Sequence, residues 1–341
     1  MLISGSSGCL HAPYSVGEPD SLFSEYVLVW DLVNSHYACF FAKENKDWDQ
    51  LYETFKSAAE NLESKAELFD LCLTVMGEME DQNLVIRDSL GNRMESWNQD
   101  DFVNWDLSVL IQYIEGYSPD TVVIIRPNYG AIKFNPTHSD TVGYLYVRDL
   151  GNLFGMMDFY YRTYTIQYCN GLILDLRMCG GSGSEINAFN ACGRFIEQSA
   201  LAYYRAFRTG PGRNDMGELQ EVFSCRNGSW QFTNPIILLT GRFTQGAGEQ
   251  LVLLLKNQPH VTVIGDTTAG FANPAVSFNL TDGCTVEIPW MVTYSPDSTL
   301  ILNSGIAPDI FVPVSEADFA AGVDPVFDAA LEMILNRPIA Q

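Results

Sequence analysis

The chain has 341 residues, of which 47% are hydrophobic, and this is enough to bury a large core; we expect one α/β domain and a smaller one. Lys and Arg number 19 against 42 Asp and Glu, a formal net charge of −23, so the surface repels phosphate backbones and nucleic-acid binding is disfavoured. No apolar run is long enough to span a bilayer, which argues against a transmembrane segment.

The first ninety residues are predicted to form an arm followed by helices. Residues 1–20 are interpreted as an N-terminal arm or a signal remnant, and residues 21–90 as a helical module. Apolar residues recur in this module at spacings of three and four, which predicts three helices, at 23–37, 47–62 and 67–79. Residues 91–120 begin with a polar, irregular stretch and are interpreted as a connection.

Residues 1–9, MLISGSSGC, fit the end of a lipoprotein signal in which Cys9 is acylated. They lack the basic region and most of the apolar core of such a signal. Two hypotheses therefore stay open for these residues: export of the protein to the periplasm or as a lipoprotein, and a disordered start of the chain. The eight cysteines form no C-x-x-C pair, and the four histidines form no H-E-x-x-H motif. We therefore predict no metal site and no cofactor.

Residues 121–341 are predicted to form a layered α/β core, because strand patterns alternate with helical ones. The predicted strands are 121–126, 143–148, 171–176, 235–240 and 261–265, with an antiparallel pair at 276–280 and 285–289. The predicted helices are 154–168, 184–197, 248–256 and 324–336. Residues 209–218, TGPGRNDMGE, are interpreted as a flexible loop that could cover a site.

The stretch 171–183, GLILDLRMCGGSG, carries the clearest sign of a site. An apolar run typical of a buried strand leads directly into Gly180, Gly181 and Gly183. Glycines between a strand and a helix let backbone N–H groups converge on an anion or a developing oxyanion. The alternative is a tight turn with Ser184 as the N-cap of the next helix. The stretch matches neither nucleotide-binding glycine motif.

Several segments, taken in order, resemble the tail-specific, or C-terminal processing, serine peptidases, and the tricorn-core branch more than the Ser/Lys branch. The segments that carry the resemblance are the helical start, 143–150, 171–181, 238–249 (LLTGRFTQGAGE), 263–270, 305–310 (GIAPDI) and the helix opened by Asp324-Pro325. Cys179 stands where the family's D-L-R-x-N-x-G-G strand ending has Asn. The resemblance implies a helical module followed by a layered α/β spiral core of the crotonase/ClpP-like kind. No PDZ domain is evident between 83 and 143.

The catalytic residues that this resemblance implies are missing from their places. The nucleophilic Ser of T-x-S-A-x-E is Gly246, the general-base His is Asn83, and the Glu three residues before the terminal signature is Leu302. The Ser/Lys branch would require Lys where Phe271 stands. Glycine has no side chain to acylate, and Asn is no general base near neutral pH. The resemblance therefore implies a pseudopeptidase whose cleft is lined by Gly180, Gly181 and the backbone near Ala247.

In this first hypothesis, a peptide or the C-terminus of an unfolded polypeptide is the partner, and it adds to a sheet edge. The second hypothesis is an active serine-type hydrolase with a relocated nucleophile: Thr244, Ser182 or Ser184, with His138 or His260 as base. A third, acyl-thioester binding on a related spiral fold, has no residue signal of its own. The oligomeric state does not follow from the sequence.

Overall fold

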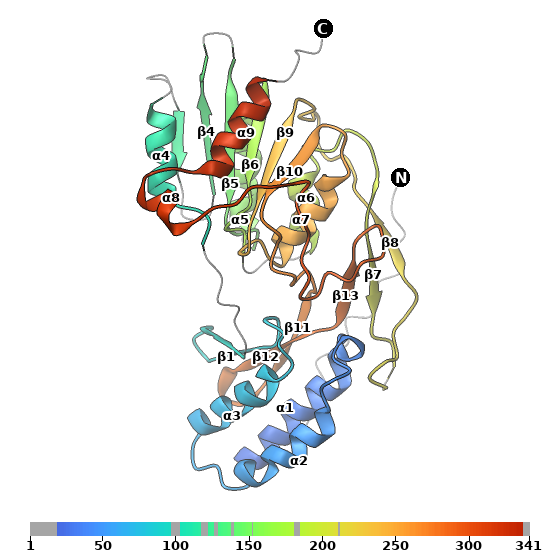
Figure 1. The fold of residues 1–341 in the computed structure, drawn as a ribbon. Helices are drawn as coiled ribbons and strands as arrows, with labels where there is room; N and C mark the ends of the chain where they lie inside the picture. Colours follow the sequence, from blue (N-terminus) through green and yellow to red (C-terminus); the bar gives the residue numbers. More distant parts are fainter. Residues whose placement is uncertain are drawn as a thin grey trace. The chain divides into compact units, whose positions relative to one another are not determined.

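The fold is mixed α/β, as expected, with a set of helices and several sheets (Figure 1). The computed structural model describes residues 19–96, 103–116, 122–125, 129–137, 140–151, 153–180, 185–210 and 212–336. The chain divides into two compact units. The first holds the described residues up to 96 together with those of Phe207–Gly217 and Ala275–Met291, and the second holds the remainder. The boundaries inferred from the sequence, at 90 and 120, stay predictions.

The first unit contains the helical module. Its helices are α1 (Leu22–His36), the short η1 (Phe40–Ala42), α2 (Trp48–Ala59) and α3 (Lys65–Gly77). Each α-helix begins at a side chain that accepts a hydrogen bond from a backbone N–H of the first turn: Ser21, Asp47 and Ser64. The three helices predicted from periodicity are therefore confirmed, with ends that differ by a few residues.

A four-stranded antiparallel sheet completes the first unit. Its order is β11 (Ala275–Asn279), β12 (Thr285–Pro289), β1 (Val85–Arg87) and β2 (Arg93–Glu95). The expected pairing of β11 with β12 is confirmed, and the turn between them is η2 (Thr281–Gly283). β12 pairs with β1, about two hundred residues earlier in the chain, which joins this late hairpin to the helical module.

The loop 209–217 belongs to the first unit and is held by Arg213. The guanidinium of Arg213 makes a bidentate ion pair with Asp49 of α2, at 2.6 and 2.9 Å, and donates to Oδ1 of Asn34 of α1 at 2.8 Å. It also lies over the ring of Phe40, 5.2 Å from its centroid. The described part of this loop is thus anchored to two helices, whereas the sequence predicted a flexible loop.

A seven-stranded sheet forms the centre of the second unit. Its order is β14 (Ile310–Phe311), β10 (Val261–Gly265), β9 (Ile236–Thr240), β6 (Gly171–Asp175), β5 (Val142–Val147), β4 (Tyr129–Phe134) and β3 (Val122–Ile125). Strands β5, β6, β9, β10 and β14 are parallel, and β3, β4 and β5 pair antiparallel. The sequence predicted five of these strands and missed β4 and β14.

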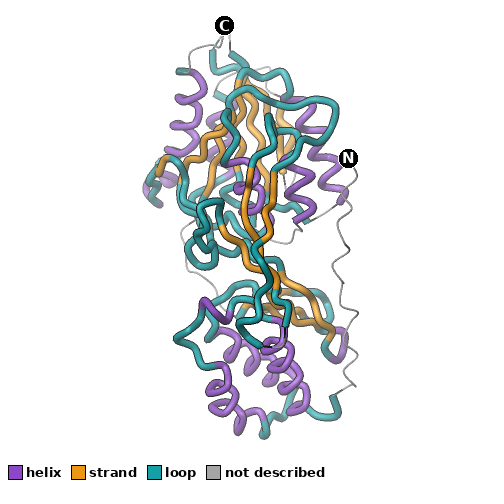
Figure 2. The backbone as a smooth tube through the Cα atoms, turned by 90° about the vertical axis from the view of Figure 1, so that its right-hand side faces the viewer, coloured by secondary structure: helices purple, strands orange, loops and turns teal. Residues whose placement is uncertain are grey.

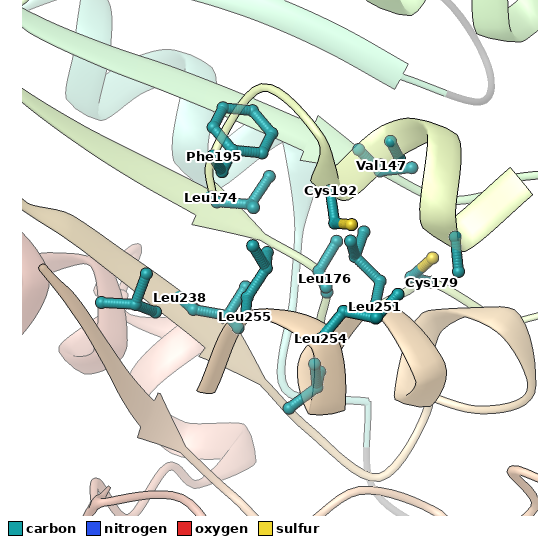
Figure 3. Close-up of a cluster of buried hydrophobic side chains, with 14 of the residues drawn as sticks. Val147, Leu174, Leu176, Cys179, Cys192, Phe195, Leu238, Leu251, Leu254 and Leu255 are labelled. Atoms are coloured by element: carbon teal, nitrogen blue, oxygen red, sulfur yellow. The ribbon is translucent and has the colours of Figure 1, made fainter. Parts of the chain in front are cut away.

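Alternating side chains along the parallel strands build two hydrophobic cores, one on each face of the sheet. Leu172 and Leu174 of β6 pack in a core with residues of α5 (Leu153–Ile166), α6 (Glu185–Cys192) and α7 (Ala247–Lys256), part of which Figure 3 shows. Ile173 packs in the opposite core with residues of α4 (Leu107–Glu115) and α9 (Pro325–Leu335). Helices therefore cover both faces, which is why these strands are apolar throughout.

The remaining strands and helix lie outside the central sheet. Strands β13 (Met291–Tyr294), β7 (Leu201–Phe207) and β8 (Gln220–Phe223) form a three-stranded sheet, and α8 (Glu316–Ala320) precedes α9. Figure 2 distinguishes the helices from the strands along the chain. Among the residues that the structure describes, no helix combines the length and the apolar character needed to cross a membrane.

Candidate active site

Two turns meet at the carboxyl ends of the adjacent parallel strands β6 and β9. The N–H of Gln245, in the turn after β9, donates to the carbonyl oxygen of Cys179, in the turn after β6, at 3.0 Å. A Cβ added to Gly180 would lie 2.9 Å from the Phe243 carbonyl oxygen, and one added to Gly248 would lie 2.4 Å from the Cys179 oxygen. Glycines at both positions therefore allow the turns to touch, at the sheet edge where α/β proteins bind ligands.

Gly246 occupies the junction between this turn and α7. It is the N-cap residue of the helix, with φ 56° and ψ −122°. This conformation is costly for a residue with a side chain, and residues held in it cluster at active sites. A nucleophile between a strand and a helix is typically presented by a strained turn of this kind. Ala247, the first residue of α7, follows it and is buried.

The carboxylate of Glu249 is fully buried in the first turn of α7, and four donors converge on it. Its Oε1 accepts from the Thr268 hydroxyl at 2.5 Å and from the Gly270 N–H at 2.7 Å, and its Oε2 accepts from the Phe271 N–H at 2.7 Å. The backbone N–H of Gly246 is the fourth donor. Burial raises the pKa of Glu249 to about 7, although the hydrogen bonds act in the opposite direction.

Sequence reasoning did not predict a role for Glu249. Two signals pointed to it: Glu249 is the final Glu of the family's T-x-S-A-x-E pattern, and it lies three residues after the N-cap, from which an acidic side chain can reach back to the N-cap N–H. Its burial and its bonds to the turn at 268–271 depend on residues about twenty positions further along the chain. These bonds fix Gly246, α7 and that turn relative to one another.

Leu302 lies in a segment that packs on the turn held by Glu249. Leu302 itself is buried. The N–H of Asn303 donates to the Gly270 oxygen at 2.9 Å, and the N–H of Ile306 donates to the Thr268 hydroxyl oxygen at 2.8 Å. The structure therefore connects the segments of Gly246 and Leu302 through a continuous hydrogen-bond network. Phe271, at the position of the Ser/Lys-branch lysine, is buried in the same turn.

Thr244 is fully buried, and both hydrogen-bonding functions of its hydroxyl are used by the backbone. The hydroxyl donates to the Leu176 carbonyl oxygen at 2.7 Å and accepts from the Gly241 N–H at 3.1 Å. The backbone oxygen of Thr244 accepts from the Ala269 N–H at 2.9 Å. These bonds join the turn after β9 to the turns after β6 and β10.

His260 lies at the opposite end of the sheet from Gly180 and Gly246. It immediately precedes Val261, the first residue of β10, whereas Gly246 follows the carboxyl end of β9. Because β9 and β10 are parallel, the structure does not bring His260 next to Thr244. Burial lowers the pKa of His260, so its ring is neutral near pH 7. The other named candidates, His138, Gly181, Ser182 and Ser184, lie outside the described residues.

Asn83 belongs to the first unit, whereas Gly246 and Leu302 belong to the second. Its backbone N–H donates to Oδ1 of the buried Asp81 at 2.9 Å. The other carboxyl oxygen of Asp81 accepts from the Tyr37 hydroxyl at 2.9 Å. The position where the family resemblance places a histidine is therefore fixed at the end of the helical module by a buried carboxyl group.

A buried ion-pair network supports the turn after β6. Arg177 is fully buried, and its guanidinium contacts Asp175 at 2.7 Å and Asp324, the N-cap residue of α9, at 2.8 Å. It also donates to the Asn104 carbonyl oxygen at 2.9 Å. The Tyr144 hydroxyl of β5 donates to Asp175 at 2.8 Å. The D-L-R segment thus connects β6 to β5 and α9 and holds the strand end that precedes Gly180.

Comparison with known proteins identifies the family to which this fold and site belong. Residues 141–312, half of the chain, match the family described as Peptidase family S41, and the chain belongs to this family. The tricorn protease of Thermoplasma volcanium is 25% identical over 196 residues, 57% of this chain and 17% of that protein. The carboxyl-terminal-processing protease of Synechocystis sp. is 27% identical over 171 residues, 49% of this chain and 38% of that protein.

The structure also resembles that of a solved protein from Parabacteroides merdae, with a TM-score of 0.76 at 24% sequence identity. The match covers 94% of this chain and 98% of that chain. The predicted relation to tail-specific and tricorn-type peptidases is thus confirmed, as is the α/β peptidase-like core. The chain spans less than two-fifths of the length of the two curated relatives named above.

Proposed function

We propose that this chain is a catalytically inactive S41-family protein that retains a peptide-binding cleft. The observation that carries the proposal is the glycine at position 246. It has the backbone conformation expected of a strained nucleophile turn, at the N-terminus of a helix and beside the Gly180 turn, but it has no side chain to attack a carbonyl carbon. Loss of the nucleophile of a serine protease costs on the order of a millionfold in rate.

Two further positions support inactivity. Asn83 stands in the place of the base, and its amide takes no proton near neutral pH. Leu302 stands in the place of the acidic residue, and its buried aliphatic side chain cannot orient an imidazole. Glu249 of α7 is a carboxylate close to Gly246 in the sequence and could be considered a replacement for the missing acidic residue. Its hydrogen bonds to the turn at 268–271 give it a structural role instead.

The proposed cleft is built from backbone groups. Gly180 and the N-terminal residues of α7 meet at the carboxyl ends of β6 and β9, where the positive end of the helix dipole favours a negatively charged or carbonyl oxygen. The N–H groups of Gly180 and Gly248 themselves donate to carbonyl oxygens of their own turns. A helix N-terminus of this kind attracts a main-chain carbonyl or a terminal carboxylate and does not require a reactive side chain. A peptide, or the C-terminus of an unfolded polypeptide, is therefore the proposed partner.

The second candidate function is hydrolysis by a relocated nucleophile. Thr244 argues against it, because its buried hydroxyl donates to one backbone group and accepts from another. His260 gives no support either, because it lies at the other end of the sheet. Ser182 and Ser184 remain the alternative nucleophiles of this second candidate.

The activity test uses a fluorophosphonate probe and a fluorescently labelled unfolded protein. The wild type is compared with Thr244→Ala, Ser182→Ala and Ser184→Ala, and with Gly246→Ser as the variant that restores a hydroxyl at the junction. We expect no labelling and no cleavage by the wild type. Labelling or cleavage that one of the three alanine substitutions abolishes would overturn inactivity and establish the relocated nucleophile.

The binding test measures fluorescence anisotropy of peptides that carry either a free or an amidated C-terminus. We expect saturable binding, weaker for the amidated peptide because the N–H groups at the N-terminus of α7 favour a carboxylate. Equal binding of both forms would place recognition in the peptide main chain alone. Absence of binding to either peptide and to the unfolded protein would refute the cleft.

A further inference from the structure

Two cysteines of the second unit, Cys192 and Cys225, lie side by side although neither belongs to the candidate active site. Cys192 is the last residue of α6 and is fully buried; Figure 3 shows its sulfur in the hydrophobic core. Cys225 follows β8 and is exposed. One of the two thiols is thus accessible from solvent, and the other is shielded directly beside it.

Backbone pairing brings the two segments together. The N–H of Asn227 donates to the Gly193 oxygen at 2.9 Å, and the N–H of Phe232 donates to the Arg194 oxygen at 2.7 Å. A Cβ added to Gly193 would lie 2.3 Å from the Asn227 Cβ and 3.0 Å from its backbone nitrogen. The glycine after Cys192 therefore permits a closer approach of the two segments than another residue would allow.

The sulfur of Cys192 lies against the backbone of Cys225. The backbone N–H of Cys225 hydrogen-bonds to the sulfur of Cys192. Each thiol also donates to a nearby carbonyl oxygen: Cys192 to Phe189 at 3.2 Å, and Cys225 to Phe223 at 3.6 Å. Hydrogen bonds donated by thiols are weak, so rotation of the exposed Cys225 side chain towards Cys192 breaks only one weak hydrogen bond.

We propose that Cys225 and Cys192 are a thiol-oxidation site, in which Cys225 reacts with a low-molecular-weight disulfide and Cys192 then closes an intrachain disulfide. The Cys225 thiolate attacks one sulfur of the small disulfide R–S–S–R, forms a mixed disulfide and releases one R–S⁻. The Cys192 thiolate attacks the Cys225 sulfur of that mixed disulfide and releases the second R–S⁻. The two protein thiols lose two electrons and two protons, and the small disulfide is reduced to two thiols.

The second step, attack by Cys192, depends strongly on pH. Burial raises the pKa of Cys192 to about 12, so only a small fraction of this residue is thiolate near neutral pH. The groups facing it are the Cys225 residue, the carbonyl of Phe189 and two tyrosine hydroxyls, those of Tyr160 and Tyr203. Its other neighbours in the core are apolar. The mixed disulfide on Cys225 therefore accumulates first, and its resolution accelerates about tenfold per pH unit below that pKa.

The resulting bond would connect the end of α6 to the end of β8. Helix α6 begins at Glu185, five residues after Gly180 in the sequence, so the disulfide would restrain the helix that follows the proposed cleft along the chain. The bond would also close a loop of chain between 192 and 225, which stabilises the folded state by restricting the unfolded one. This inference does not depend on whether the cleft binds peptides.

The test treats the folded, full-length protein with oxidised glutathione and follows it by intact mass and by peptide mapping. Trypsin combined with a Glu-specific protease separates Cys192, in peptide 186–194, from Cys179, and places Cys225 in peptide 222–226. We expect a glutathione adduct on Cys225, then a cross-link between these two peptides, formed faster at pH 9 than at pH 7. Cys192→Ala should stop at the adduct, and Cys225→Ser should form neither product.

The matched control is Cys169→Ala, which removes another buried cysteine of the same unit and should leave the cross-link unchanged. The proposal is overturned if the wild type keeps Cys192 free for alkylation after oxidation and unfolding. It is equally overturned if Cys225 couples only to a second molecule, or if Cys192→Ala and the wild type behave alike.

Discussion

Replacement of Glu249 by Gln tests whether a buried carboxyl group controls the stability of the second unit as the pH changes. The wild-type carboxyl is fully buried and accepts from Thr268, Gly270, Phe271 and the N–H of Gly246. The substitution preserves the shape of the side chain but removes its titration. Any pH-dependent difference between the two proteins then comes from this one group.

The size of the effect follows from the pKa of Glu249, which burial raises from the ordinary value of 4.5 to about 7. The folded state therefore holds the proton more tightly than the unfolded state. The linked stability is fully present below the unfolded pKa and is lost as the pH rises through the folded one. Each tenfold change in proton affinity corresponds to about 1.4 kcal/mol, so the wild type should lose about 3 kcal/mol relative to Glu249→Gln between about pH 4.5 and about pH 8.

The assay is urea unfolding of both proteins across this pH range, monitored by tryptophan fluorescence and circular dichroism. The matched control is Glu221→Gln, which removes an exposed carboxylate of β8 and should leave the pH profile almost unchanged. The free energy of unfolding of the wild type, relative to that of Glu249→Gln, should fall as the pH rises. A difference that stays constant over the whole range would show that Glu249 does not titrate as the structure implies.

Three further substitutions are tested by urea unfolding, two at residues that support the site and one in the loop of the first unit. Arg177→Met leaves the carboxylates of Asp175 and Asp324 buried without their cation, and should cost about 3–5 kcal/mol; a loss below about 1 kcal/mol would contradict the buried network. Gly246→Ala puts a Cβ on a backbone at φ 56° and should cost about 1–3 kcal/mol, whereas a gain in stability would argue against that conformation. Arg213→Ala breaks a partly exposed ion pair with a carboxylate of α2 and should cost less than about 1 kcal/mol, with a smaller effect at high salt.

Much of the second unit could be predicted because buried parallel strands have a simple sequence pattern. The apolar runs of β6, β9 and β10 predicted these strands to within about one residue, since both faces of the sheet are covered by helices. β4 was missed because its sequence, YGAIKF, contains Gly and Lys and lacks a continuous apolar run. β14 has only two residues and owes its existence to pairing with β10.

Local sequence patterns could not predict which segments of the chain form each unit. The hairpin of β11 and β12 was predicted correctly, but only the pairing of β12 with β1 assigns it to the unit of the helical module. Likewise, the residues of loop 209–218 are typical of a flexible turn, yet Arg213 finds its partners on α1 and α2. Such contacts join residues more than a hundred positions apart, and no local period encodes them.

For the site, the sequence by itself determined which chemical groups are present. It shows glycine, asparagine and leucine at 246, 83 and 302, and the identity of a side chain needs no coordinates. Only the tertiary structure decided how the groups around Gly246 behave: the contact of the two turns, the buried hydroxyl of Thr244 and the raised pKa of Glu249. The physical reason is that burial and hydrogen bonding depend on neighbours contributed by distant segments, whereas the presence or absence of a nucleophilic atom belongs to the residue alone.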